Sequence, residues 1–261
     1  MELLAPPQWH CVDFISDLHL QASEMATFSA WVDYMQSTQA DAVFILGDLF
    51  EVWVGDDAAE VAGSFEAECV SVLRQTGERL ALFIMQGNRD FLMGPALMQA
   101  CLATGLPDPS VLTFAGQRWT LSHGDALCVS DLEYQAFRQQ VRSVAWQEEF
   151  LLKPLDERQQ IAGSIRKASA SKKMTATSYA DVDSIAALTL LHRSGAPHLL
   201  HGHTHRPGQQ QLAPGMVRTV LSDWDLSATP PRAEVLRIST LATGTPAPIR
   251  LPASTITKPV D

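Results

Sequence analysis

The chain has little cysteine. Its 261 residues include four, at Cys11, Cys69, Cys101 and Cys128. No two of them are spaced as C-x-x-C, which excludes the common cysteine-based zinc motifs. Four scattered thiols in a chain of this length indicate reduced, buried side chains rather than a disulfide framework.

Long apolar runs are also missing. No stretch reaches the roughly 18 apolar residues that a membrane-spanning helix needs. Residues 1–10 show neither the basic start nor the apolar segment of a signal peptide. We therefore expect a cytoplasmic protein. Peripheral contact with a membrane is still compatible with the sequence, because an amphipathic face provides it without a spanning segment.

Positive charge is scarce. Lys and Arg number 19 against 29 Asp and Glu, which gives a formal net charge of −10. An acidic surface repels phosphates, so we expect no nucleic-acid partner. An anionic substrate is not excluded, since a bound cation reverses the local sign. Hydrophobic residues make up 46% of the chain and charged residues 18%, as in globular proteins that bury a core.

What the sequence does contain is an alternation of apolar runs and helical patterns. The apolar runs lie at residues 11–15, 42–46, 80–85, 119–121 and 199–200. Apolar residues at helical spacing fill 21–38 and 61–76 between the first three runs. Strands that alternate with helices are typical of an α/β layered domain, in which ligands collect at the carboxyl ends of the strands.

Seven candidate metal ligands follow these runs. They are Asp17, His19, Asp48, Asn88, His123, His203 and His205. Two pairs in this set are separated by a single residue, which puts both side chains on one face of extended backbone. A glycine precedes Asp48 and another precedes Asn88, where it allows a sharp turn. We expect these side chains to converge although they are far apart in the sequence.

The set of donor atoms indicates the kind of metal site. Carboxylates, an amide oxygen and imidazoles without thiolates suit Mn, Fe or Zn better than Mg or Ca. Seven ligands exceed one tetrahedral site but fit two metals that share a carboxylate, an arrangement that polarises a phosphoryl oxygen and generates hydroxide. Each short motif alone is common as a turn or strand-end cap. Their occurrence in order at the ends of apolar runs predicts a two-metal phosphoesterase.

Residues 130–180 interrupt the alternation with long helical patterns. They hold eight of the 19 Lys and Arg: Arg138, Arg142, Lys153, Arg158, Arg166, Lys167, Lys172 and Lys173. We interpret this segment as a helical insertion whose basic face either attracts anionic headgroups, at about 1 kcal/mol per basic residue, or is simply solvated. The core then comprises 1–129 and 181–240. Residues 241–261, rich in Pro, Thr and Ala, are predicted to be a flexible C-terminal tail.

Residues 13 to about 207 resemble the calcineurin-like metallophosphoesterases. The matching motifs are Asp17-Leu18-His19, Gly47-Asp48, Gly87-Asn88-Arg89-Asp90, His123-Gly124-Asp125 and Gly202-His203-Thr204-His205. The resemblance implies an α/β fold, a two-sheet sandwich flanked by helices, with two metals at the strand ends. It also implies that Asp48 bridges the metals. The other ligands would be Asp17, His19 and His205 on one metal and Asn88, His123 and His203 on the other.

Arg89 indicates a narrower family within that superfamily, because many of its members have His rather than Arg after Gly-Asn. Six strings of this sequence are similar to the UDP-2,3-diacylglucosamine pyrophosphatase family of lipid A synthesis. They are SDLHL, ILGDLFEVWVGDD, GNRDFLMG, HGDALC, YQAFR and HGHTHRP. In that family a helical cap follows the HGD motif. The resemblance implies hydrolysis of UDP-2,3-diacylglucosamine, with two Mn²⁺ per chain, to UMP and 2,3-diacylglucosamine 1-phosphate (lipid X). It further implies an acylated nucleotide-sugar substrate and peripheral attachment to the cytoplasmic face of the inner membrane; we expect a monomer.

The resemblance also implies substrate contacts. They are Asn88, Arg89, Asp131, Tyr134, Ser169, Lys173 and His203, of which Asn88, Arg89 and His203 are the catalytic candidates. Arg89 would stabilise developing negative charge, or else form a salt bridge to Asp90 or to a neighbour. Lys172 and Lys173 are adjacent, and we favour Lys173. Two other functions stay open: a general metallophosphodiesterase or dinucleotide hydrolase on the same metal core, and a scaffold, which the retention of all seven ligands disfavours.

Overall fold

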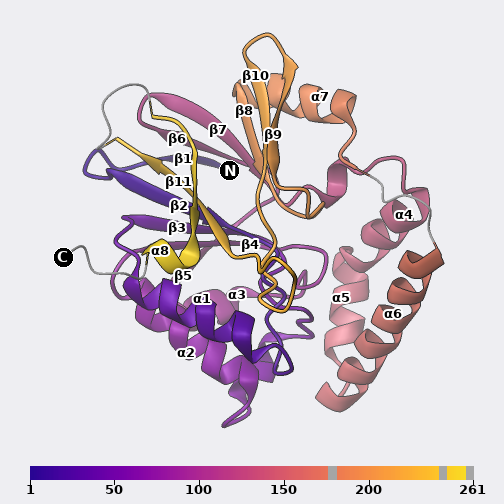
Figure 1. The fold of residues 1–261 in the computed structure, drawn as a ribbon. Coiled ribbons are helices and arrows are strands. Elements are labelled where there is room, and N and C mark those ends of the chain that lie inside the picture. Colours follow the sequence, from indigo (N-terminus) through magenta and orange to yellow (C-terminus); the bar gives the residue numbers. More distant parts are fainter. Residues whose placement is uncertain (176–180, 241–245, 257–261) are drawn as a thin grey trace.

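The structure is a computed structural model that describes residues 1–175, 181–240 and 246–256, with the side chains of 167–175 outside the described part. Two six-stranded mixed sheets pack face to face at its centre, and helices cover their outer faces (Figure 1). This confirms the predicted two-sheet sandwich flanked by helices.

The order of strands brings the parallel ones together. The first sheet runs β1 (Glu2–Leu4), β6 (Ser110–Phe114), β7 (Gln117–Ser122), β8 (His198–His201), β10 (Met216–Val220), β9 (Gly208–Ala213). The second runs β12 (Ile249–Pro252), β11 (Glu234–Ser239), β2 (Cys11–Ile15), β3 (Ala42–Leu46), β4 (Ala81–Met85), β5 (Ala103–Leu106). Because β2, β3 and β4 are parallel neighbours, as are β7 and β8, the carboxyl ends within each group lie side by side.

The central strands are apolar throughout because both of their faces are buried. In β3, Phe44 belongs to the core between the two sheets, and its neighbour Ile45 to the core under the helices. The Phe44 ring stacks on Phe14 of β2 and on Phe83 of β4, with centroids 5.0 and 4.6 Å apart. Full burial of each such side chain contributes roughly 1.5–3 kcal/mol, so these layers fix the positions of the strand ends.

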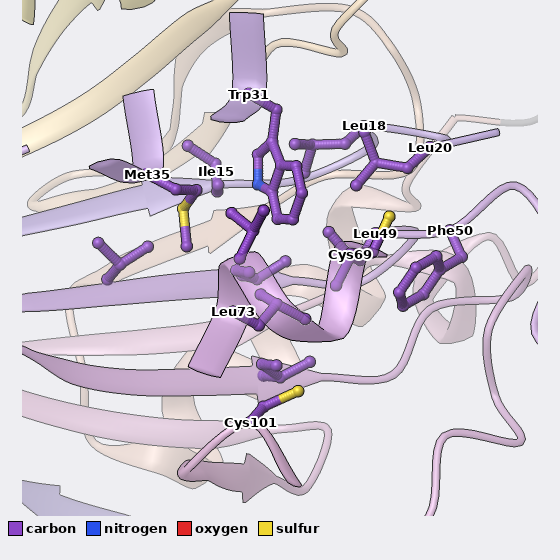
Figure 2. Close-up of a cluster of buried hydrophobic side chains, with 14 of the residues drawn as sticks. Ile15, Leu18, Leu20, Trp31, Met35, Leu49, Phe50, Cys69, Leu73 and Cys101 are labelled. Atoms are coloured by element: carbon purple, nitrogen blue, oxygen red, sulfur yellow. The ribbon is translucent and has the colours of Figure 1, made fainter. Parts of the chain in front are cut away.

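Helices α1 (Met25–Ser37), α2 (Phe65–Gly77) and α3 (Pro95–Ala100) flank the second sheet, and α7 (Ser184–Ser194) flanks the first (Figure 1). Trp31 and Met35 of α1 are fully buried beside Leu73 of α2 (Figure 2). The 3₁₀ turns η1 (Asp56–Glu60) and η2 (Asp125–Leu127) lie in loops. All four cysteines are buried and free, which confirms the prediction of reduced thiols.

Three successive helices, α4 (Leu132–Val141), α5 (Val144–Leu151) and α6 (Leu155–Thr175), lie between β7 and β8 in the chain and stand beside the sheets (Figure 1). We call them the cap. Phe150 is only 5% exposed because it joins the hydrophobic core under the helices. No helix in the described residues is long and apolar enough to cross a bilayer.

The cap arginines differ from the predicted basic face. Arg138 donates to Asp125 at 2.8 Å, Arg142 donates to the Gly87 carbonyl at 2.8 Å, Arg158 pairs with Asp57, and Arg166 pairs with Glu51. These four side chains face core residues, so neither the headgroup-binding nor the solvated interpretation holds for them. Instead they dock the cap on the core.

The predicted flexible tail also needs correction. Ile249–Pro252 form the edge strand β12, which pairs antiparallel with β11, and Ala253–Ile256 form the short helix α8. Backbone pairing with β11 and burial of Ala253, which is 2% exposed, hold this segment on the sheet. The rest of the predicted tail, at 241–245 and 257–261, lies outside the described residues.

Candidate metal centre

All seven candidate ligands lie at the carboxyl ends of parallel strands. Asp17 follows β2, Asp48 follows β3 and Asn88 follows β4 in the second sheet. His123 directly follows β7, and the pair His203 and His205 follows β8 in the first sheet. The ends of the two sheets meet, since the backbone N–H of His203 donates to both carboxylate oxygens of Asp17 at 3.0 and 2.9 Å.

The backbone of these turns is in an uncommon conformation. Five of the seven candidates have positive φ: Asp17 (53°), His19 (49°), Asp48 (52°), His203 (67°) and His205 (50°). The i, i+2 pairs are therefore not extended, which corrects the argument from strand alternation. A left-handed turn at each position aims both side chains of a pair into the same space. Positive φ is rare outside glycine and, where it clusters, marks functional sites.

One group of ligand atoms lies around Asp17. His205 Nε2 is 3.4 Å from Asp17 Oδ1 and 3.2 Å from His19 Nε2. These three side chains offer ligand atoms within 4.8 Å of one another, and so do Asp17, Asp48 and His123. The two groups share Asp17, and together they leave room for more than one cation.

Asp48 lies between the histidines of the two predicted sites. Its Oδ2 is 4.0 Å from His19 Nε2, and its Oδ1 is 3.6 Å from His123 Nε2. His123 Nε2 also lies 2.9 Å from Asn88 Oδ1, and the His203 ring is centred 5.1 Å from the His123 ring. A carboxylate whose two oxygens face different histidines suits the bridging role that the resemblance implies.

The packing around Asp48 and Asp17 depends on glycine. A Cβ at Gly87 would lie 2.1 Å from Asp48 Oδ1, and one at Gly202 would lie 2.2 Å from Asp17 Oδ2. Gly47 has φ +91°, and a Cβ there would meet His123. The sequence argument for a sharp turn thus holds at Gly47, whereas Gly87 and Gly202 are required for close approach.

The charges of this pocket fit divalent cations. Burial lowers the pKa of His123, but the carboxylates of Asp48, Asp125 and Asp17 together more than offset this and raise it to about 9. Burial also lowers the pKa of His205, but the Asp17 and Asp223 carboxylates outweigh this effect and raise it to about 10. Buried carboxylates thus draw positive charge to this pocket, and with imidazole and amide donors they form a set that fits a pair of divalent metals.

A cavity of about 330 Å³ opens on these residues. Asp48, Asn88, Arg89, His203 and His205 are among the residues that line it. Arg89 holds Asp48 through its backbone N–H, which donates to Oδ1 at 2.8 Å. No carboxylate among the described residues pairs with the Arg89 guanidinium, so the alternative of an Asp90 salt bridge is wrong.

Asp90 has a different task. Its carboxylate accepts backbone N–H groups of Gly87 at 2.7 Å and of Leu49 at 2.7 Å. This ties the loop after β4 to the loop after β3. Burial and the neighbouring Asp48 raise the pKa of Asp90 to about 7.

Predicted substrate contacts on the cap divide into two sets. Asp131 caps α4 by accepting the backbone N–H of Tyr134 at 3.0 Å. The Tyr134 ring is centred 6.2 Å from the His203 ring, and its hydroxyl donates to buried Asp125. Tyr134 therefore lies beside the metal-ligand candidates, while Asp131 has a capping role. The side chains of Ser169 and Lys173 lie outside the described residues, as does that of Lys172.

Sequence reasoning missed two carboxylates behind the histidines. Glu51 Oε2 is 2.7 Å from His19 Nδ1, although the oxygen lies off the direction of an aligned hydrogen bond. Asp223 Oδ2 is 3.5 Å from His205 Nδ1. Glu51 lies within the string ILGDLFEVWVGDD and Asp223 outside every quoted string, and neither has a sequence pattern that marks it as the partner of a histidine. His201, by contrast, is a packed strand residue: it is fully buried, and its Nε2 accepts a hydrogen bond from Arg218 Nε at 2.8 Å.

Comparisons with known proteins identify sequences and folds similar to this chain. The profile of a family described as calcineurin-like phosphoesterase matches residues 12–207. A protein named UDP-2,3-diacylglucosamine hydrolase from Aromatoleum aromaticum is 41% identical over 217 residues, 81% of this chain and 88% of the relative. The protein of that name from Ralstonia nicotianae is 42% identical over 242 residues, 87% of this chain and 88% of the relative. Among solved structures, a Vps29 single mutant from Entamoeba histolytica aligns at 14% identity with a TM-score of 0.46, covering 92% of this chain and 98% of its own.

Proposed function

Because the chain belongs to the UDP-2,3-diacylglucosamine hydrolase family of calcineurin-like phosphoesterases, we propose that it hydrolyses the pyrophosphate of UDP-2,3-diacylglucosamine. Water adds to one phosphorus, the bond to the bridging oxygen breaks, and the products are UMP and 2,3-diacylglucosamine 1-phosphate. The observation that carries the proposal is the convergence on one cavity of the candidate metal ligands and of Arg89, whose guanidinium pairs with no carboxylate among the described residues.

We assign Asp17, His19, Asp48, Asn88, His123, His203 and His205 to two divalent cations, for which we propose Mn²⁺. When bound, the cations supply Lewis-acid charge that neutralises phosphoryl oxygens and activates water. The chain contributes the rest. Arg89 presents free guanidinium donors in the cavity, where they would stabilise negative charge on the phosphoryl groups. Asn88 and His203 would hold the substrate beside it.

The cap also borders a second cavity, of about 250 Å³, between the loop after β3 and α6. It is lined by Val52, Trp53, Val54, Ala58 and Glu66 of the core and by Gln159, Gly163 and Arg166 of α6, so charged and polar side chains line it beside apolar ones. Trp146 and Phe150 of the cap pack on the core. Ser169 and Lys173 stay proposed substrate contacts.

We further propose that the protein acts as a monomer at the inner-membrane surface. Three apolar side chains of the cap are strongly exposed: Leu132 (76%), Val144 (71%) and Leu152 (87%). They supply the membrane contact that the docked arginines do not. Such contact would give the enzyme access to an acylated substrate in the bilayer.

The test is an assay with metal-stripped protein, with single divalent metals added back. We expect release of UMP from the diacylated sugar nucleotide with Mn²⁺, and at least about a 100-fold loss of kcat in Arg89→Met with metal content unchanged. Asp48→Ala is expected to lose both metal and activity. Faster cleavage of a nucleotide that lacks acyl chains would favour a general phosphodiesterase or dinucleotide hydrolase instead.

A further inference from the structure

Two histidines of the candidate metal centre have the same support behind them. Each presents Nε2 to the ligand group and Nδ1 to a carboxylate, and each carboxylate pairs with an arginine. One series of contacts runs from His19 through Glu51 to Arg166. The other series runs from His205 through Asp223 to Arg232. A carboxylate near Nδ1, at 2.7 Å for His19 and 3.5 Å for His205, favours the ring orientation that leaves Nε2 free to bind a cation.

The two series of contacts differ in which part of the fold supplies the arginine. Arg232 lies in the same loop as Asp223 and binds both of its oxygens, with Nε 3.0 Å from Oδ1 and Nη2 2.7 Å from Oδ2. All three residues of that series therefore belong to the core. Arg166 lies on α6 of the cap, 115 residues from Glu51. Glu51 itself is held beside the His19 turn, because its backbone N–H donates to the Leu20 carbonyl at 3.1 Å.

Glu51 therefore has one oxygen on a candidate ligand and the other on the cap. Its side chain is 12% exposed, and those of His19 and Arg166 are 18% and 35% exposed, so the contact with His19 is the better shielded from water. The other docking arginines do not reach a ligand through a carboxylate that contacts its ring. Arg158 holds Asp57 and the Val54 carbonyl, Arg138 holds Asp125, and Arg142 holds the Gly87 carbonyl. Glu51 is thus placed to link docking of α6 with the orientation of His19.

We propose that Glu51 is a positioning residue that couples docking of the cap to cation binding at the site of His19, through the ion pair between Glu51 and Arg166. The proposal rests on the proposed function only in that a divalent cation binds at His19. Coupling of this kind is reciprocal: if the docked cap favours the ligand geometry of His19, a bound cation must favour the docked cap by the same factor.

Hydrogen exchange of α6 residues 155–166 and Mn²⁺ affinity by calorimetry test the coupling. In the wild-type protein we expect Mn²⁺ to slow exchange in this segment by roughly fivefold or more. Arg166→Met and Glu51→Gln should each abolish that metal-dependent change and weaken binding at one of the two sites by about tenfold or more. Glu51→Gln keeps the shape of the side chain, so it separates coupling from a general loss of docking.

Arg232→Met is the matched control. It breaks the equivalent series of contacts at His205, so it should weaken Mn²⁺ binding yet leave the metal-dependent protection of α6 intact. Wild-type α6 exchange that ignores Mn²⁺, or protection that survives in Glu51→Gln and Arg166→Met, would overturn the proposal. Neither measurement uses a substrate, so a wrong substrate assignment would leave both results unchanged.

Discussion

At the scale of single residues, the metal centre is held in strained backbone by hydrogen bonds from the opposite loop. Asp17 and His19 both have positive φ, and their backbone N–H groups donate to the carbonyls of Gly47 at 3.1 Å and Asp48 at 3.0 Å. A residue in such a conformation costs about 1–3 kcal/mol, which surrounding structure must offset. The turns therefore support each other, and disturbing one should disturb the whole ligand set.

Gly87 offers a direct test of this dependence. In Gly87→Ala the new Cβ would lie 2.1 Å from Asp48 Oδ1 and 2.4 Å from the Asp48 nitrogen, so Asp48 must shift. We expect Mn²⁺ affinity to fall by about tenfold or more, measured by calorimetry. In Gly105→Ala the nearest atom is the Met98 side chain at 3.6 Å, an ordinary contact. This control should bind like the wild type. Two tightly bound metals in Gly87→Ala would contradict the argument.

The residue scale also shows what sequence can and cannot foretell. Asp17 and His205 are recognisable because they belong to short motifs that follow apolar runs. Glu51 and Asp223 are not, because their roles arise only when folding brings them behind a histidine. The left-handed backbone at the ligands was equally hidden, since Asp and His carry no local signal that distinguishes it from an extended pair.

At the scale of secondary-structure elements, the cap is attached by arginines that face the core. Arg158 is the buried one, 2% exposed, and donates to the Lys153 and Val54 carbonyls as well as to Asp57. Composition alone places such a residue on a basic surface. Only the fold shows that it binds core carbonyl and carboxylate groups, which is why the sequence-based interpretation of the insertion was wrong for its arginines.

Asp57 allows the attachment to be tested by pH. The hydrogen bond from Arg158 is the main cause that lowers the pKa of Asp57. A lowered carboxylate pKa stabilises the fold above the unfolded value, and the effect is lost as the pH falls through the folded pKa. Asp57→Asn should therefore have a lower Tm than the wild type at pH 7, with a gap that closes on acidification.

Calorimetric scans from pH 7 to pH 3 provide the measurement. Glu157→Gln is a suitable comparison, because Glu157 of α6 pairs in an exposed contact with Lys153, which lies just before that helix. Water screens exposed pairs of that kind, so a smaller change is expected. A gap for Asp57→Asn that stays constant over the whole pH range would exclude its charge as the anchor.

Edge strands were the elements least accessible from sequence. β9 carries the sequence GQQQLA and is mostly exposed or half-buried, so it lacks the apolar run that identifies a buried strand. Its backbone pairing with β10 creates the strand. The central strands were predictable because burial on both faces requires continuous apolar sequence.

At the scale of the whole molecule, metal binding should be linked to proton release. The pKa of His123 is raised to about 9 and that of His205 to about 10, so both are protonated at pH 7 in the metal-free protein. A cation must displace these protons, roughly two per chain. Affinity for Mn²⁺ should therefore rise with pH up to about these values. The metal-free protein should in turn lose stability as the pH rises through them.

Calorimetry in buffers of different ionisation enthalpy counts the released protons. The observed heat at pH 7 should change with the buffer in proportion to about two protons, and the dependence should shrink toward pH 10. A heat that is the same in every buffer would mean that His123 and His205 are already neutral, or that they do not bind the metal.

The net charge of −10 affects how this molecule can bind an anionic bilayer. Its charge opposes the approach, and Arg138, Arg142, Arg158 and Arg166 of the cap face partners on the core. Among the described side chains of the cap, we therefore expect the exposed apolar ones to supply the attraction. Leu132 and Leu152 are 76% and 87% exposed on the cap. Burial of a leucine contributes up to about 1.5–3 kcal/mol. Replacing both with Gln should weaken binding to vesicles by at least roughly tenfold, as measured by cosedimentation.

Ile185 is the control for that experiment. It is 75% exposed but lies on α7, outside the cap. Ile185→Gln removes a comparable apolar surface from another face, so vesicle binding should not change. If it weakens binding as much as the leucine substitutions do, or if those have no effect, the cap does not face the membrane. Salt should strengthen rather than weaken the wild-type interaction, because screening reduces the repulsion between an acidic protein and anionic lipid.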